Sequence, residues 1–291
     1  MRRLFLIRAY GDFIIAIRAI LFSPQPSSIK IVASEHFKPL YTALAKVIDL
    51  SSLQIEFQNF EINNAQLNLF TDRYLLDSST IKQLKSIRKY FLKSSDENFE
   101  DYIEHNKRLK LFQFLTKHEF EPIIKQSKVY NEYNLFFNPI FKEIEFKIKN
   151  TGRILILPDA RIQKRNLPQE IVQEIIHLSN EKNYQVQIAY FKRVSQVDKK
   201  GKVSSVRFKT DLIFSQKVYN NFDELIELIQ TADFVIGADS LPIHLSNLLQ
   251  KPHFILYPSH GSKAFFTPFA LEHKFYAEFD QFEQESIPFL S

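Results

Sequence analysis

Residues Ala232–Ser259 read ADFVIGADSLPIHLSNLLQKPHFILYPS, and this stretch decides the fold. The apolar run Phe234–Ile236 lacks the alternation of a half-exposed strand and predicts a parallel strand covered on both faces. A helix is expected over Leu241–Leu249, because Pro242 suits a first helical turn and leucines follow at helical spacing. A second strand is expected at His253–Tyr257. This order of strand, polar turn, helix and strand indicates a Rossmann-like unit.

The polar turn of this stretch brings together groups that suit a phosphate or diphosphate. Asp239, Ser240 and His244 lie where the free N–H groups and the positive end of the helix dipole point. Gly237 is expected to let the chain turn. An ordinary helix N-cap by Asp239 or Ser240 is the common alternative interpretation of the same residues.

The same alternation of strands and helices runs through the chain and predicts an α/β protein with parallel sheets. In the first half, strands are expected at Arg3–Ile7, Ile29–Ala33, Leu53–Phe57 and Leu67–Phe70, and helices at Asp12–Leu21 and His36–Ile48. In the second half, further strands are expected at Arg153–Leu157 and Gln185–Tyr190, and further helices at Gln169–Glu181 and Phe222–Thr231.

The chain of 291 residues is long enough for two domains, each with its own core. A new strand-helix alternation starts after Asn150-Thr151-Gly152, which we predict to be the domain boundary. The first domain is then 1–150, with a helical, charged insert at about 80–125, and the second is 151–291. A polar insert is expected at Ser195–Ser205.

The amino-acid composition limits the kinds of site and partner that this protein can have. Hydrophobic residues make up 45% and charged residues 24%, a normal globular balance, and the formal net charge is +5. This charge favours anionic partners. Because the sequence has no recognisable nucleic-acid-binding module, we expect that nucleic acid is not among them. The absence of cysteine excludes disulfides, thiol catalysis and cysteine-ligated zinc. With no apolar stretch near the ~20 residues needed to span a bilayer, we expect a cytoplasmic protein.

Three motifs in one order resemble the heptosyltransferase-like glycosyltransferases of family 9. The pattern Gly-x-Asp-Ser-x-Pro-x-His at Gly237–His244 resembles the family's donor-binding signature. Leu4–Asp12 resembles its first strand and Gly-Asp turn, and Ile154–Pro158 leads into Lys164–Pro168 (KRNLP) at the family's spacing. The resemblance implies the glycosyltransferase B architecture, in which two Rossmann-like domains face a central cleft.

The resemblance also implies roles for individual residues. Asp12 matches the general base that removes the proton from the acceptor hydroxyl, although the residue type alone suits a helix cap equally well. Arg165 is the first choice, and Lys164 and Arg161 the next, for neutralising the leaving diphosphate; a solvated basic loop is the alternative. Ser240, His244 and the N–H groups after Asp239 match the rest of the donor site, and Asp239 is expected near the donor sugar. Leu241 occupies a position of the same site.

We therefore expect an inverting, metal-independent glycosyltransferase with no cofactor. It would move a sugar, with heptose as one candidate, from a nucleotide-diphosphate sugar to a lipopolysaccharide, lipooligosaccharide or other cell-surface glycan precursor. The chain has no Asp-x-Asp motif and no paired histidines that suggest a metal site.

Three features depart from the family pattern. Leu241 stands where glycine is usual, and Asp159 stands where a small residue is common. The acidic residue that the family uses on the donor ribose is missing, because Lys192 and Arg193 follow the strand at Gln185–Tyr190. The alternative function is therefore a catalytically silent relative that acts as a binding or scaffold subunit.

A basic stripe is expected on one helix of the first domain. Lys82, Lys85, Lys89 and Lys93 recur at helical spacing with no acidic residue between Ser78 and Ser95. Such a stripe suits peripheral contact with anionic lipid at the inner membrane surface, in keeping with a lipid-linked acceptor, and a solvated helix face is the alternative.

Overall fold

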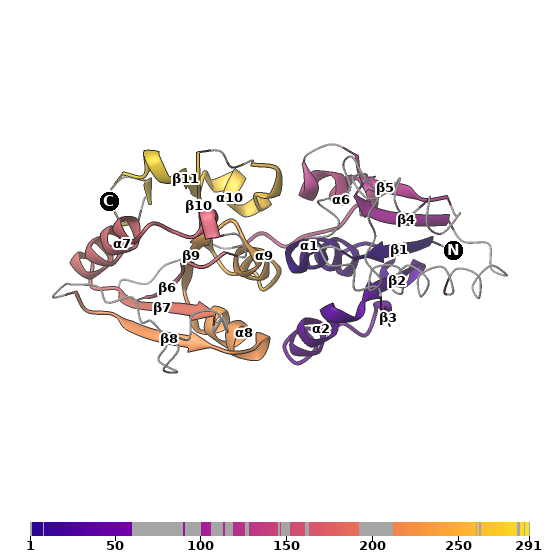
Figure 1. Ribbon diagram of the computed structural model, residues 1–291, viewed down its shortest axis with the longest axis horizontal. Coiled ribbons are helices and arrows are strands. Elements are labelled where there is room, and N and C mark those ends of the chain that lie inside the picture. Colours follow the sequence, from indigo (N-terminus) through magenta and orange to yellow (C-terminus); the bar gives the residue numbers. More distant parts are fainter. Residues whose placement is uncertain are drawn as a thin grey trace, which may run out of the picture. The chain divides into compact units, whose positions relative to one another are not determined.

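Two compact units, Met1–Phe141 and Lys142–Ser291, make up the computed structural model (Figure 1). It describes residues 2–7, 9–59, 90, 100–105, 113, 119–125, 128–144, 146, 152–160, 163–191, 212–259, 261, 263–283, 286, 287, 289 and 290. The predicted boundary at 150/151, the strand at 67–70, the basic stripe and the insert at 195–205 lie outside these residues. They stay predictions.

The N-terminal unit is built on a parallel sheet whose described strands have the order β3-β2-β1-β4-β5. The strands are β1 (Arg2–Leu6), β2 (Ile29–Ser34), β3 (Gln54–Gln58), β4 (Glu100–His105) and β5 (Glu121–Ile124), and the helices are α1 (Tyr10–Leu21), α2 (Lys38–Leu44) and α6 (Val129–Phe137). Short 3-10 turns span Pro26–Ser28 and Glu35–Phe37. β1 lies at the centre of the sheet, and its residues from Arg3 to Leu6 are buried, as in a strand that is covered on both faces.

Strand β4 corrects the expectation that the charged insert at about 80–125 is helical. It lies between β1 and β5, and Ile103 is fully buried in the core. Asp101 is tolerated there because the Arg3 guanidinium of β1 donates two hydrogen bonds of 2.6 Å to its carboxylate. Most of the predicted insert lies outside the described residues.

The C-terminal unit is built on a second parallel sheet, of order β11-β10-β9-β6-β7-β8 (Figure 1, magenta to yellow). The strands are β6 (Arg153–Leu157), β7 (Gln185–Phe191), β8 (Ser215–Tyr219), β9 (Phe234–Ala238), β10 (His253–Tyr257) and β11 (Tyr276–Glu278). The helices are α7 (Gln169–Glu181), α8 (Phe222–Thr231), α9 (Leu241–Leu248) and α10 (Pro268–His273), with 3-10 turns at Gln163–Arg165, Lys263–Phe265 and Phe279–Gln281.

Helices cover both faces of this sheet. One face forms a core with apolar residues of α7 and α10 and with Ile287 and Leu290 near the end of the chain. Helix α9 contacts β9, β10 and α8, and α8 contacts β6 and β8. The predicted α/β class with two Rossmann-like parallel sheets is therefore confirmed.

Gly237 has a different role from the predicted turn. It lies inside β9, which continues to Ala238, so the turn begins at Asp239. A Cβ atom on Gly237 would lie 3.1 Å from the carbonyl oxygen of Leu157 and 3.3 Å from Cδ1 of Ile243 in α9. The glycine is needed because β9 packs closely against both neighbours, not because the chain turns there.

Candidate functional site

The carboxyl ends of β6 and β9 form the topological switch point of the C-terminal sheet. From β6 the chain builds β7 and β8 on one side, and it then returns to build β9, β10 and β11 on the other. Parallel sheets of this kind bind ligands outside the carboxyl ends of the strands at such a point. Because Leu157 pairs with Gly237, the loops that start at Pro158 and Asp239 leave the sheet side by side.

Asp239 and Ser240 connect the end of β9 to the start of α9. Ser240 is the N-cap residue of α9, but its side chain caps no helix N–H. Its hydroxyl lies 3.2 Å from the carbonyl oxygen of Ala238 and 3.5 Å from that of Asp159. The hydroxyl thus ties the β9 turn to the β6 loop, and the predicted ordinary N-cap hydrogen bond is not made by this residue.

An ion pair joins the two loops. Arg165 Nη1 lies 3.6 Å from Asp239 Oδ2, and the Asp239 side chain is only 7% exposed, while that of Arg165 is 37% exposed. The pair brings together two residues that the sequence predicted for the donor site. A half-exposed guanidinium held by a buried carboxylate is a fixed positive charge that can still bind an external anion.

The loop that carries Arg165 is closed by its own hydrogen bonds. Leu167 N donates to the Pro158 carbonyl at 2.9 Å, and Ala160 N donates to Asn166 Oδ1 at 2.8 Å. The sequence does not reveal this closure, because Asn166 looks like any loop residue. These bonds place Arg165 before a ligand arrives, which lowers the entropic cost of binding.

The other predicted donor residues differ in exposure. Lys164 is exposed next to Arg165, and Leu241 is half-buried as the first residue of α9. Arg161 lies outside the described residues. Their roles in donor binding stay predictions.

His244 is a buried, uncharged imidazole in the first turn of α9. The residue is only 4% exposed. Burial, followed by the charges of His253 and Arg165, lowers the pKa of His244 to about 3. A phosphate contact by His244 would therefore be a hydrogen bond from a neutral ring rather than an ion pair.

The low pKa of His244 predicts that acid destabilises the fold. The folded-state pKa of about 3 is below the unfolded value of about 6.5, so the unfolded chain binds more protons between these values. The contribution of neutral His244 to the free energy of unfolding is fully present above about pH 6.5, and it is lost as the pH decreases toward about 3. Between pH 7 and pH 5, urea titration should show a loss of about 2 kcal/mol more for the wild type than for His244→Gln. Equal losses in both proteins would contradict this assignment.

Asp12 occupies the carboxyl edge of the N-terminal sheet. It lies in the first turn of α1 and is 4% exposed. The N-cap of α1 is Ala9, so Asp12 is inside the helix rather than at the cap position that the alternative interpretation gave it. The positive end of the helix dipole favours the ionised carboxylate there, as a general base requires.

Tyr190 is a neighbour of the site that the sequence analysis missed. It lies near the end of β7, next to β6 in the sheet. Burial, followed by the negative charge of Asp159, raises the pKa of Tyr190 to about 12. Asp159 is therefore close enough to Tyr190 for its negative charge to act on the phenol. Only sheet order reveals this proximity, because 31 positions separate the two residues in the sequence.

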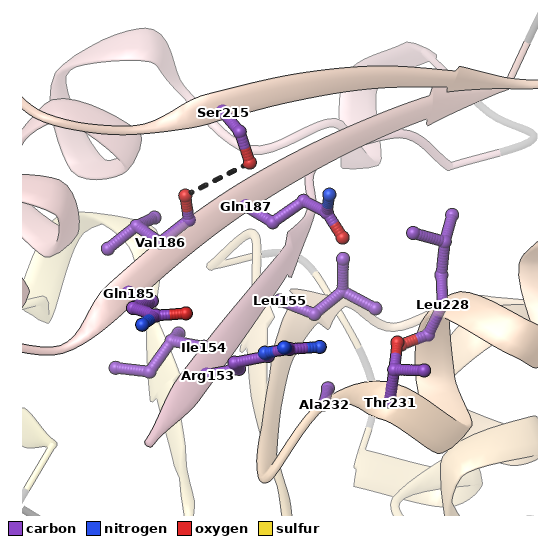
Figure 2. A pocket seen from close by; sticks show the side chains of 10 residues that line it. All are labelled: Arg153, Ile154, Leu155, Gln185, Val186, Gln187, Ser215, Leu228, Thr231 and Ala232. Atoms are coloured by element: carbon purple, nitrogen blue, oxygen red, sulfur yellow. Dashed lines mark hydrogen bonds between the residues drawn. The ribbon is translucent and has the colours of Figure 1, made fainter. Parts of the chain in front are cut away.

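A separate cavity of about 190 Å³ lies at the opposite, amino edge of the C-terminal sheet (Figure 2). Arg153, Gln185 and Ser215, the first residues of β6, β7 and β8, line it together with Leu228 and Thr231 of α8. The carboxyl end of α8 lines this cavity, and the negative end of a helix dipole disfavours anions. We therefore place the anion site at the switch point and not in this cavity.

The described residues contain neither a candidate metal centre nor a helix that could span a membrane. Among them, no group of three or more His, Cys, Asp or Glu side chains is arranged to hold a metal ion. Every helix in the same part of the chain is too short or too polar to span a bilayer.

Comparison with solved structures identifies the fold. E. coli heptosyltransferase WaaC with ADP superimposes with a TM-score of 0.55 at 13% identity, over 91% of this chain and 89% of that chain. WaaC with ADP-2-deoxy-2-fluoro heptose gives 0.55 at 14%, over 96% and 92%. E. coli ADP-heptose lps heptosyltransferase II gives 0.56 at 12%, over 96% and 90%. The chain thus has the glycosyltransferase B fold of these proteins.

Comparison of the sequence with family models identifies the family. No curated protein matches the sequence. Residues 132–277, just over half of the chain, match the model of glycosyltransferase family 9 (heptosyltransferase). The matched residues include Arg165, Asp239 and all of α9, which build the switch point. The chain therefore belongs to glycosyltransferase family 9, the heptosyltransferase family.

Proposed function

We propose that the protein is an inverting glycosyltransferase that takes its sugar from a nucleotide-diphosphate donor. ADP-heptose is the first candidate, because the similar solved structures bind ADP and an ADP-heptose analogue. The proposed acceptor is a lipopolysaccharide, lipooligosaccharide or other cell-surface glycan precursor. The observation that carries the proposal is the Arg165–Asp239 pair at the switch point, beside the N-terminus of α9.

The donor diphosphate is proposed to bind over the first turn of α9. Its charge would be balanced by Arg165, by Lys164 and Arg161, and by the helix N-terminus. During transfer, negative charge builds on the departing diphosphate as the bond to the anomeric carbon breaks. Positive groups fixed in advance stabilise this charge without reorganisation, and the reaction then needs no metal ion.

Asp12 is proposed to accept the proton of the attacking acceptor hydroxyl. The acceptor oxygen forms a bond to the anomeric carbon as the bond to the phosphate oxygen breaks, and the nucleoside diphosphate leaves. Attack from the side opposite the leaving group inverts the anomeric configuration. The positive end of the α1 dipole favours the charged carboxylate that this step needs.

The proposed substrates also suggest where the protein works. We infer a cytoplasmic protein that uses a cytoplasmic nucleotide sugar. Peripheral contact with the inner membrane surface, through the basic stripe at 82–93, would bring it to a lipid-linked acceptor.

The donor site can be tested by comparing two variants of the ion pair. Arg165→Ala should weaken ADP binding about tenfold to a hundredfold, because a charge-assisted phosphate contact is lost. Asp239→Asn should keep most of the affinity for ADP but lose the extra affinity that the sugar of ADP-heptose provides. Calorimetric titration measures both.

Lys217→Ala is the matched control for the loss of one positive charge. Lys217 is exposed on the edge strand β8 and should be replaceable without effect on ADP binding. Equal ADP affinity in the wild type and in Arg165→Ala would contradict the proposed diphosphate site. No saturable binding of ADP-, UDP- or GDP-sugars to the wild type would favour the silent relative.

A further inference from the structure

Asp159 is a carboxylate at the switch point for which the proposed chemistry gives no use. It follows β6 directly and is half-buried. A carboxylate beside a diphosphate is electrostatically unfavourable. A part of the donor away from the diphosphate would suit a carboxylate better.

The backbone around Asp159 is held on three sides. The Asp159 carbonyl lies 3.5 Å from the Ser240 hydroxyl. The Pro158 carbonyl accepts from Leu167 N at 2.9 Å, and Ala160 N donates to Asn166 Oδ1 at 2.8 Å. The backbone of Asp159 is thus held by the same bonds that hold the loop of Arg165.

Sheet register places Asp159 next to the end of β7. Ile156 of β6 pairs with Ile188 of β7, so Asp159, three residues further on, reaches the same edge of the sheet as Phe191, the last residue of β7. The negative charge of Asp159 contributes to the raised pKa of Tyr190, as this proximity requires. Asp239, the other acid of the switch point, lies on the β9 side and is paired with Arg165.

The end of the second strand is where Rossmann-like units bind a ribose. An acidic residue there commonly accepts hydrogen bonds from the ribose hydroxyls. In this unit the second strand is β7, and the sequence continues with Lys192 and Arg193 instead of an acid. Asp159 follows the neighbouring strand β6 and reaches the same edge of the sheet, so it can supply a carboxylate there.

We infer that Asp159 binds the ribose hydroxyls of the nucleotide donor and replaces the acid that the end of β7 lacks. A carboxylate accepts hydrogen bonds from both vicinal hydroxyls of a ribose. On this assignment Arg165 contacts the diphosphate on the β9 side and Asp159 the ribose on the β7 side. The inference rests on the proposed function, because it requires a nucleotide to bind at the switch point.

The test pairs a change in the protein with a change in the ligand. Calorimetric titrations would use ADP, 2′,3′-dideoxy-ADP, which lacks both ribose hydroxyls, and inorganic pyrophosphate, which lacks the ribose. The dissociation constant of the wild type should be about tenfold lower, or lower still, for ADP than for dideoxy-ADP. Asp159→Ala should bind ADP and dideoxy-ADP equally, with pyrophosphate affinity unchanged or increased because a negative charge is gone.

Two further variants keep the result interpretable. Glu174→Ala removes an exposed carboxylate of α7 and should behave as the wild type with all three ligands. Asp159→Asn keeps the size of the side chain and should show the same loss of discrimination, so it stands in if the alanine variant does not fold.

The outcomes separate this inference from the proposed function. If the wild type binds ADP and the Asp159 variants still prefer ADP to dideoxy-ADP as strongly as the wild type, the ribose assignment is wrong and the donor site stands. If UDP or GDP binds more tightly than ADP, the same comparison is made with the dideoxy form of that nucleotide. If ADP, UDP and GDP all fail to bind to the wild type, both the inference and the proposed function fail.

Discussion

Asp12→Asn is expected to lower kcat about 10²- to 10⁴-fold while leaving donor affinity close to that of the wild type. A general base contributes an acceleration of this size, and an amide cannot accept the proton of the acceptor hydroxyl. Asn is close to Asp in size and fits a residue that is only 4% exposed. The measurement is the rate of sugar transfer at saturating donor, together with the dissociation constant of the donor.

Asp49→Asn provides the matched control for Asp12→Asn. Asp49 lies in the same unit, is fully exposed, and accepts a hydrogen bond from Ser51 N at 3.0 Å. The same change of carboxylate to amide should leave kcat unchanged there. A kcat of Asp12→Asn within about threefold of the wild type would remove Asp12 from the proposed chemistry.

Arg3→Met is expected to destabilise the N-terminal unit by about 3–5 kcal/mol. Both side chains of the Arg3–Asp101 pair are almost fully buried, at 3% and 0% exposure, and Arg3 also lies over the Phe5 ring. Removing the guanidinium leaves the Asp101 carboxylate without its bidentate partner between β1 and β4. Urea denaturation followed by circular dichroism measures the change in the free energy of unfolding.

Arg2→Met is the control one position earlier on the same strand. Arg2 pairs with Glu100 at 3.5 Å, but the two side chains are 50% and 69% exposed. An exposed pair of this kind contributes about 0–1 kcal/mol, so the variant should be nearly as stable as the wild type. In Arg3→Met/Asp101→Leu most of the lost stability should return, because no uncompensated charge remains. Equal stabilities of the Arg2 and Arg3 variants would contradict the claim that burial makes the loss of Arg3 from its pair with Asp101 more costly than the loss of Arg2 from its pair with Glu100.

Much of the C-terminal unit could be predicted because its strands and helices carry strong patterns. The predicted bounds of β6, α7, α8 and β10 agree with the structure. The strands β6 and β10 are short apolar runs, and the helices have an apolar stripe that packs on the sheet. Local sequence is sufficient where the buried face is continuous.

The missed strands lack that local signal. β8 reads SQKVY and is mostly exposed, as is usual for an edge strand, so no apolar run marks it. β4 reads EDYIEH, and its charge suggested a solvated helix. Its Asp101 is buried only because Arg3, far away in the sequence, neutralises it. Long-range pairing of this kind cannot be deduced from a local pattern.

The candidate site could be predicted in its residue types but not in its connections. The sequence motifs indicated Arg165, Asp239 and Ser240, and the structure places these three residues on adjoining loops. The Arg165–Asp239 ion pair and the proximity of Asp159 to Tyr190 depend on the order of strands in the sheet. The loop is closed by a hydrogen bond to Asn166 within the loop itself, which no sequence pattern marks. His244 is buried deeply enough to be neutral, which its place in a first helical turn did not reveal.

The most direct test of the proposed function is transfer itself, in the presence of a chelator. ADP-heptose would be incubated with the protein, EDTA and a lipooligosaccharide acceptor preparation, and 31P NMR would follow the release of ADP. We predict that ADP is released only when the acceptor is present, that EDTA has no effect, and that Asp12→Asn releases it at least about a hundredfold more slowly. If the wild type releases the nucleoside diphosphate from ADP-, UDP- and GDP-heptose no faster than Asp12→Asn does, with every acceptor, the protein is not the proposed glycosyltransferase.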